Sequence, residues 1–210
     1  MAKRSVDIII SGIGGQGVVL ASTMIGSAAV DEGLDVKIAE THGLAQRGGS
    51  VMSHVRIGRD LFSPLIPSGQ ADAIVSFEPL EVARYVSFIQ PVSGIMIFNT
   101  KGILPMPVRL GMESYPSIKS LITILHKYSP RIYPIDVDQI AINAGNIRTS
   151  NIVMLGALTA SIRLPFSIES LKTAIKKGVP KGTEEVNMRA FTLGIEAMKN
   201  LNRNYMIERT

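Results

Sequence analysis

Residues 6–22, VDIIISGIGGQGVVLAS, run from a short apolar segment through a glycine-rich turn into a second apolar stretch. The first segment predicts a buried strand, and residues 16–32 predict a helix. Gly12, Gly14 and Gly17 fit the spacing G-x-G-x-x-G at this strand–helix junction. Glycines let the backbone turn tightly and approach a ligand, and free N–H groups at a helix start attract an anion. The stretch therefore predicts either a phosphate-binding loop or a tight turn that binds nothing.

Apolar runs and helical stretches alternate along the rest of the chain. Strands are expected at residues 36–40, 73–77, 94–98 and 131–135, and helices at 79–88, 117–127, 152–162, 167–178 and from 183 onward. Strands that are apolar on both faces are typical of a parallel sheet covered by helices. The chain is therefore predicted to be an α/β protein with a Rossmann-like, mostly parallel sheet and a helical C-terminal third, in a single domain of residues 1–210.

Residues 51–57, VMSHVRI, differ from the other predicted strands because their two faces are unlike. Val51, Ser53, Val55 and Ile57 lie on one face, and Met52, His54 and Arg56 lie on the other. This period predicts a strand with one wetter face, at an edge of the sheet or at a contact between subunits. It also leaves open a homodimer of the isolated chain. Residues 58–70 contain two prolines and two glycines, so they are expected to form a loop.

The composition is that of an ordinary globular protein, with 46% hydrophobic and 19% charged residues among 210. No stretch of about eighteen uncharged apolar residues occurs, which argues against a membrane span. The chain contains no cysteine. Disulfides, thiol catalysis, zinc–thiolate sites and iron–sulfur ligation are therefore excluded, and a cytoplasmic location is expected.

The net charge of +5 is concentrated in the last third of the chain. Residues 1–145 contain 12 basic and 12 acidic side chains, whereas residues 146–210 contain 10 basic and 5 acidic ones. Such a region fits a solvated helix surface, an acidic partner or a phosphate-bearing ligand. Nucleic acid ranks lowest, because the chain has no Trp and few aromatic residues among the basic ones.

Polar residues collect where predicted strands end, at the carboxyl edge where open α/β sheets bind ligands. Glu40 ends the second strand, 23 residues after Gly17, where a dinucleotide fold would hold the ribose hydroxyls. The residues that follow it, THGLAQRGGS, form a second glycine-containing loop that does not fit a nicotinamide cofactor. Glu78 ends another strand, and it either points into the site or sits at a helix start.

Within the second loop, Gln46 and Arg47 precede Gly48. A guanidinium fork suits a carboxylate or a phosphate, and a loop-bracing salt bridge is the alternative. His42 is placed for a functional role, but no second ligand at metal spacing accompanies it. Neither a Ser/His/Asp set nor a pair of carboxylates can be assembled. The sequence therefore predicts a binding site with no catalytic residues and no metal of its own.

Five stretches make the chain resemble the gamma-type domain of 2-oxoacid:ferredoxin oxidoreductases: GIGGQGVVLAS, ETHGLAQRGGSVMSHVRIG, ADAIVSFEPLEVARY, NIVMLGAL and EEVNMRAF. The resemblance implies a partner, a large alpha subunit that carries thiamine diphosphate and iron–sulfur clusters. Such an enzyme is expected to convert an aryl pyruvate, typically indolepyruvate, and coenzyme A to an aryl-acetyl-CoA and CO2. Two electrons pass to ferredoxin, and the carbanion chemistry belongs to the cofactor.

The resemblance further implies a subunit that packs beside the thiamine-bearing chain and helps form the coenzyme A region. The hypothesis assigns a ligand phosphate or the partner chain to Gly12, Gly14, Gly15, Gln16 and Gly17. The adjacent wall consists of Gln46, Arg47 and Gly48, ordered by Glu40 and His42, and Glu78 completes the set. The alternative is a stand-alone regulatory module that binds NAD or ATP through the same glycine loop. A third reading is an assembly subunit whose loops only dock the partner.

Overall fold

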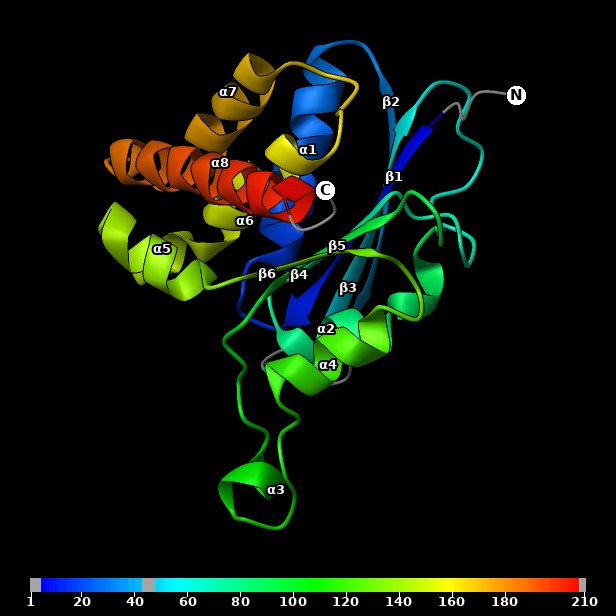
Figure 1. The fold of residues 1–210 in the computed structure, drawn as a ribbon. Helices are drawn as coiled ribbons and strands as arrows, with labels where there is room; N and C mark the ends of the chain where they lie inside the picture. The colour runs from blue at the N-terminus through cyan, green and yellow to red at the C-terminus, as the bar shows by residue number, and fades with distance from the viewer. Residues whose placement is uncertain (1–4, 43–47, 208–210) are drawn as a thin grey trace.

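The computed structural model describes residues 5–42 and 48–207, and its centre is a six-stranded sheet (Figure 1). The strands are β1 (Ser5–Ile13), β2 (Asp35–His42), β3 (Ser50–Gly58), β4 (Ala73–Ser76), β5 (Ile95–Asn99) and β6 (Arg131–Ile135). Their order across the sheet is β2-β3-β1-β4-β5-β6, and β3 runs antiparallel to both of its neighbours. Strands β1, β4, β5 and β6 pair in parallel, so the predicted α/β class with a mostly parallel sheet is confirmed.

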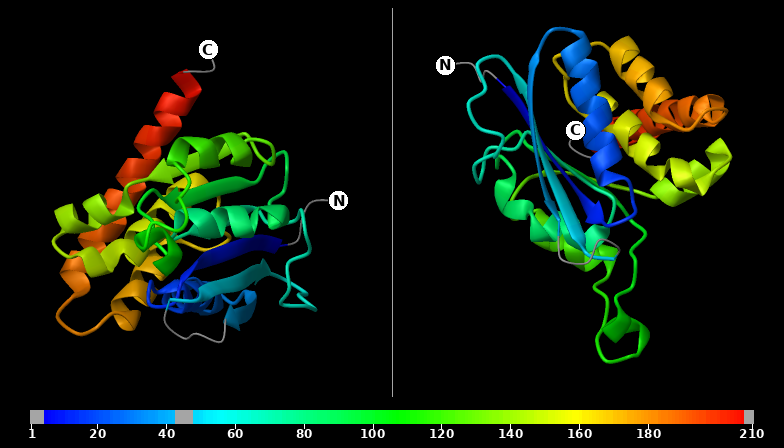
Figure 2. Two further views of the ribbon diagram at one scale, coloured as in Figure 1. Left: turned by 90° about the horizontal axis from the view of Figure 1, so that it is seen from below. Right: turned by 180° about the vertical axis from the view of Figure 1, so that it is seen from behind.

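Helices cover both faces of this sheet (Figures 1 and 2). One face is covered by α1 (Val18–Asp31), α5 (Val137–Ala144), α6 (Ser150–Ser161), α7 (Ile168–Gly178) and α8 (Glu184–Ile207). The other face is covered by α2 (Pro79–Arg84), the 3-10 turn η1 (Val86–Phe88) and α4 (Ile118–Leu125). The short helix α3 (Met106–Arg109) stands on an arm that projects from the body. The predicted helical C-terminal third is confirmed.

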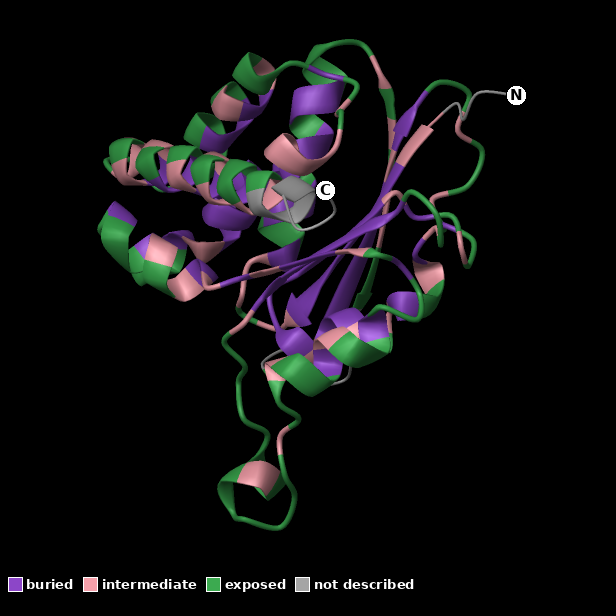
Figure 3. Cartoon of the chain, in the orientation of Figure 1, coloured by how far each residue is buried: buried purple, intermediate pink, exposed green. Residues whose placement is uncertain are grey.

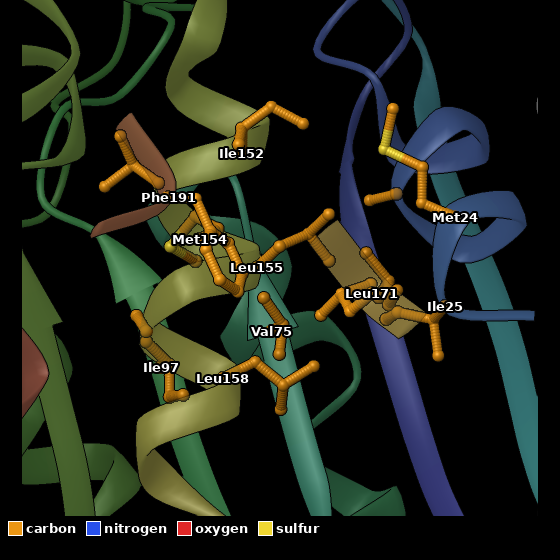
Figure 4. Close-up of a cluster of buried hydrophobic side chains, with 14 of the residues drawn as sticks. Met24, Ile25, Val75, Ile97, Ile152, Met154, Leu155, Leu158, Leu171 and Phe191 are labelled. Atoms are coloured by element: carbon orange, nitrogen blue, oxygen red, sulfur yellow. The ribbon is translucent and has the colours of Figure 1, made fainter. Parts of the chain in front are cut away.

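Alternating side chains of each strand supply the two apolar cores. Ile8 and Ile10 pack under the five-helix face, whereas Ile9 packs under the opposite one. In the larger core, Leu155 and Leu158 of α6 lie against the sheet (Figure 4). Burying each such side chain contributes about 1.5–3 kcal/mol, which is what holds the helices on the sheet.

The position of β3 corrects the expectation for residues 51–57. The strand lies between β2 and β1 rather than at an edge, and the sheet beneath the helices is buried (Figure 3). Two of its polar side chains form contacts inside the fold: His54 Nδ1 accepts a hydrogen bond from Ile66 N at 3.2 Å, and Arg56 Nε binds Asp7 Oδ1 at 3.0 Å. The alternation therefore reflects these internal contacts, and it no longer supports a homodimer.

The connections leave β1 and β4 in opposite directions across the sheet. Strand β1 continues through α1 to β2 on one side, and β4 continues through α2 to β5 on the other. The carboxyl edge between β1 and β4 is therefore the topological switch point, which is where open α/β sheets bind their ligands. Among the helices that the structure describes, none has the length and apolarity needed to cross a membrane.

Candidate functional site

The glycine loop is a rigid turn between β1 and α1. Gln16 closes it, because its Oε1 accepts a hydrogen bond from Ile13 N at 2.7 Å and its Nε2 donates to Phe77 O at 3.1 Å. Gly15 and Gly17 have φ angles of 105° and 85°, a backbone region that other residues rarely adopt. Gly15 and Gly17 thus allow the chain to adopt this turn, and the two hydrogen bonds of Gln16 hold the loop in place.

Gly48 and Gly49, the described glycines of the second loop, lie beside the first loop, as predicted. Gly14 N donates to Gly49 O at 2.8 Å, and Gly48 N approaches Gly14 O at 3.5 Å. The expectation that Gly14 offers its N–H to a ligand is corrected, because that group already joins the two loops. Gly12 lies within β1, paired with Val51.

The side chain of His42 and the whole of Gln46 and Arg47 lie outside the described part of the structure. His42 ends β2, where it is paired with Val51, and nothing further is described of its side chain. Gln46 and Arg47 lie outside the described residues, so their role remains a prediction.

Helix α1 begins at this turn without a side-chain cap. Its N-cap residue is Gly17, and among the described residues no side chain caps the N–H groups of the first turn. Helix α6 begins nearby, but N–H groups of its first turn already have acceptors: Ser150 N donates to Ile147 O, and Ile152 N donates to Asn151 Oδ1 at 3.0 Å. The free N–H groups and dipole of a helix start favour a bound anion. The start of α1 therefore favours an anion more than the start of α6 does.

The space between them is a cavity of about 420 Å³. Its wall combines Gly15, Gln16 and Gly17 with polar side chains from four other parts of the chain. The polar members are Asn99, Asp138, Arg148, Ser150 and Asn151. The cavity therefore lies at the switch point of the sheet, on the face covered by α1, α5 and α6.

Arg148 supplies the positive charge of this cavity. Its side chain is exposed, and it forms no ion pair with any carboxylate in the part of the chain that the structure describes. Asn151, 7% exposed, lies against the glycine loop: a Cβ at Gly17 would come within 2.7 Å of its Nδ2. This guanidinium, beside the uncapped start of α1, suits a phosphate or carboxylate.

Asp138 limits where an anion can sit. Its Oδ1 accepts hydrogen bonds from Asn99 Nδ2 at 3.0 Å and Ser150 Oγ at 3.4 Å, so the carboxylate is held at the cavity wall. Its negative charge repels an anion from that side. The favourable position is therefore near Arg148 and the start of α1.

Arg148, Asn151 and Asp138 were not predicted from the sequence. The signal available was the polar run GNIRTSN at residues 145–151, which interrupts two apolar helices. Nothing local, however, shows that this run faces the glycine loop.

A second cavity of about 510 Å³ continues from the first along the outer side of α1. Its wall is more apolar, and it includes Ile13, Val18, Val19, Leu20 and Val51. Together the two cavities form a surface with a cationic end and an apolar end.

Glu78 lies elsewhere, which corrects its inclusion in the site. It is 1% exposed and caps α2, because its Oε2 accepts from Leu80 N at 2.7 Å and from Glu81 N at 3.2 Å. Its Oε1 accepts a hydrogen bond from the Tyr115 hydroxyl. Burial raises the pKa of the Glu78 carboxyl, and these hydrogen bonds oppose the rise. Glu78 is a structural cap, which was the other interpretation of its position.

Glu40 is also displaced from the expected position. In a dinucleotide fold the acidic residue stands on the strand next to β1. Here β3 separates β2 from β1, and Glu40 is paired with Ser53 of β3. One intervening strand increases the distance between β2 and β1 by about 4.8 Å. Glu40 does not line either cavity and cannot hold a ribose bound at the glycine loop.

The chain is similar to known proteins along most of its length. Residues 7–197 match the pyruvate ferredoxin/flavodoxin oxidoreductase family model. The chain is 38% identical to indolepyruvate oxidoreductase subunit IorB of Pyrococcus horikoshii over 199 residues, covering 94% of this chain and 98% of that one.

Solved structures share the fold. The gamma subunit of keto/oxoacid ferredoxin oxidoreductase from Geobacter sulfurreducens superposes with a TM-score of 0.66 at 25% identity, covering 93% of this chain and 99% of that one. The 2-oxoglutarate:ferredoxin oxidoreductase of Magnetococcus marinus, solved with 2-oxoglutarate, coenzyme A and succinyl-CoA bound, superposes with a TM-score of 0.70 at 22% identity. This chain covers 32% of that longer one and is itself 94% covered. The chain belongs to the pyruvate ferredoxin/flavodoxin oxidoreductase family.

Proposed function

We propose that this chain is the small, cluster-free subunit of a 2-oxoacid:ferredoxin oxidoreductase that acts on aryl pyruvates such as indolepyruvate. The observation that carries the proposal is the family match over residues 7–197, together with near full-length similarity to an indolepyruvate oxidoreductase subunit. A large partner subunit would carry thiamine diphosphate and the iron–sulfur clusters, which supply the decarboxylation and the electron path. The absence of cysteine from this chain fits that division of labour.

The part played by this chain is the binding of coenzyme A at the edge of the joint active site. The phosphates would lie near Arg148 and the start of α1, away from the Asp138 carboxylate. The apolar end of the surface, along Val18 and Val19, would take the less polar part of the molecule. The chain's residues bind and orient, and they perform no bond-breaking step.

Arg148→Ala in the assembled complex tests this binding role. A charge-assisted contact to phosphate is worth roughly 1.5–3 kcal/mol, so we expect the affinity for coenzyme A to fall at least tenfold. Arg163→Ala is the matched control, because Arg163 is exposed at the opposite edge of the sheet. Unchanged affinity and turnover in Arg148→Ala would remove Arg148 from the site.

Arg47→Ala extends the same test to the second loop. The proposal predicts weaker coenzyme A binding here too, measured by the same titration. A thermal-shift screen of the chain alone separates the rival class: stabilisation by NAD or ATP, and none by coenzyme A, would favour a stand-alone nucleotide-binding module.

A further inference from the structure

Residues 100–116 form an arm that leaves the carboxyl end of β5, carries α3 at its tip and returns to α4 (Figures 1 and 2). The backbone hydrogen bonds of the tip are local, for example Leu110 N to Met106 O at 3.0 Å. Nearly all of the arm is exposed (Figure 3). The tip is therefore a projection whose outer surface packs against nothing in the described part of this chain.

The tip is unusually apolar for an exposed segment. Sixteen large apolar side chains are exposed in the described residues, and five of them lie within residues 103–112. They are Ile103, Leu104, Met106, Leu110 and Met112, of which Met112 is 74% exposed. Contiguous apolar surface of this kind marks an interaction site, and Met side chains adapt readily to a partner's surface.

The root of the arm is fixed. The Tyr115 hydroxyl donates to the buried carboxylate of Glu78, and the Tyr115 ring lies so close to Gly102 that no side chain fits there. Lys101 Nζ binds Asp136 Oδ2 at 3.2 Å. Three prolines, at positions 105, 107 and 116, further restrict the backbone. A preorganised arm loses little conformational entropy on binding.

The charge of the arm restricts the kind of partner. Between residues 102 and 114 the only charged side chains are Arg109 and Glu113, which cancel. A nucleic acid or an anionic membrane surface would gain no electrostatic attraction from such a segment. The complementary surface is therefore an apolar groove on another protein.

The root of the arm adjoins the proposed coenzyme A cavity through Asn99, the last residue of β5. Asn99 Oδ1 accepts from Lys101 N at 3.3 Å and from Val137 N at 3.2 Å, and Asn99 lines the cavity. A chain that closes over this cavity must therefore sit beside the arm. We propose that the arm, residues 100–116, binds the large thiamine-bearing subunit by inserting its apolar tip into a groove of that subunit. This inference rests on the proposed function.

Site-specific photo-cross-linking identifies what the tip touches. The chain carrying Leu110→p-benzoylphenylalanine is expressed together with the cognate large subunit, and the purified complex is irradiated. We expect a cross-link to the large subunit, and none from Val92→p-benzoylphenylalanine, because Val92 is exposed but lies at the amino end of β5. A cross-link from position 110 to a second copy of this chain, or to no protein at all, overturns the proposal.

An affinity measurement separates this inference from the proposed function. The triple variant Met106→Ser, Leu110→Ser, Met112→Ser should raise the Kd for the large subunit at least tenfold, whereas Val92→Ser should leave it unchanged. All these side chains are exposed, so we expect the melting temperature of the full chain to stay constant. If the wild-type chain binds the large subunit and the triple variant binds it with the same Kd, the arm proposal is wrong and the proposed function is unaffected. If the wild-type chain does not bind the large subunit, both the arm proposal and the proposed function are wrong.

Discussion

At the residue scale, Gly17 combines a left-handed backbone angle with close packing against Asn151. Its φ of 85° disfavours any side chain, and an added Cβ would lie 2.7 Å from Asn151 Nδ2. We expect Gly17→Ala to lower the free energy of unfolding by about 1–2 kcal/mol from backbone strain and to displace Asn151 from the cavity wall. Urea denaturation and coenzyme A titration of the complex measure the two effects.

Gly33→Ala is the control for this prediction. Gly33 follows α1 at its other end with a φ of 74°, and an added Cβ would meet no atom within 4 Å. This variant should lose similar stability and keep its affinity for coenzyme A. If both variants bind coenzyme A like the wild type, the glycine loop is only a turn.

His54 makes stability depend on pH. Burial lowers the pKa of this imidazole below 6.5, and the nearby positive charge of Arg56 lowers it further. The unfolded chain therefore takes up the proton first, so stability is highest above pH 6.5 and declines as the pH falls below that value. The physical reason is that Nδ1 must stay unprotonated to accept from Ile66 N.

His54→Gln should remove this share of the pH dependence, because glutamine offers an acceptor and does not titrate. Urea denaturation followed by circular dichroism, from pH 7.5 to about pH 5.5, measures the slope. The exposed His126, at the end of α4, provides the control His126→Gln. An identical slope in wild type and His54→Gln would contradict the assignment.

At the element scale, α6 and α8 pack through two glycines. A Cβ at Gly156 would collide with Phe191 O, and one at Gly194 would collide with Val153 O. Backbone atoms cannot move aside as a flexible side chain can. We expect Gly156→Ala to lower the free energy of unfolding by about 1–3 kcal/mol, as overpacking does.

Gly26→Ala in α1 is the matched comparison. It brings the same gain in helix propensity, about 1 kcal/mol, but its added Cβ meets only the end of the Ile38 side chain, at 2.9 Å. Its stability should change little. Equal losses in the two variants would show that the glycine contact does not set the spacing of α6 and α8.

Most elements were predictable because their signals are local. The strand at residues 131–135 matches β6, and Ser167 caps α7 by accepting from Ser170 N at 3.1 Å. Helix α5 was missed although its signals are present: Asp136 accepts from Gln139 N at its start, and Gly145 ends it with a φ of 115°.

The site was only partly predictable. The adjacency of the two glycine loops followed from their common edge, and the Gly14–Gly49 hydrogen bond confirms it. The order of the strands could not be predicted from the sequence, because the pairing of β3 with β1 depends on contacts between residues far apart in the chain. Arg148 was missed for the same reason: it reaches the glycine loop only when α6 packs beside α1.

At the scale of the whole molecule, the residues proposed to bind coenzyme A share one edge of the sheet. The cavity, the uncapped start of α1 and the root of the arm lie together at the carboxyl edge of the sheet. The proposed function requires a second polypeptide over this edge.

Reconstituted turnover tests this central claim most directly. The cognate large subunit, loaded with thiamine diphosphate and its clusters, is assayed for reduction of ferredoxin with indolepyruvate and coenzyme A, with and without this chain. The account predicts coenzyme A-dependent turnover only when both polypeptides are present. Equal turnover by the large subunit alone would contradict it.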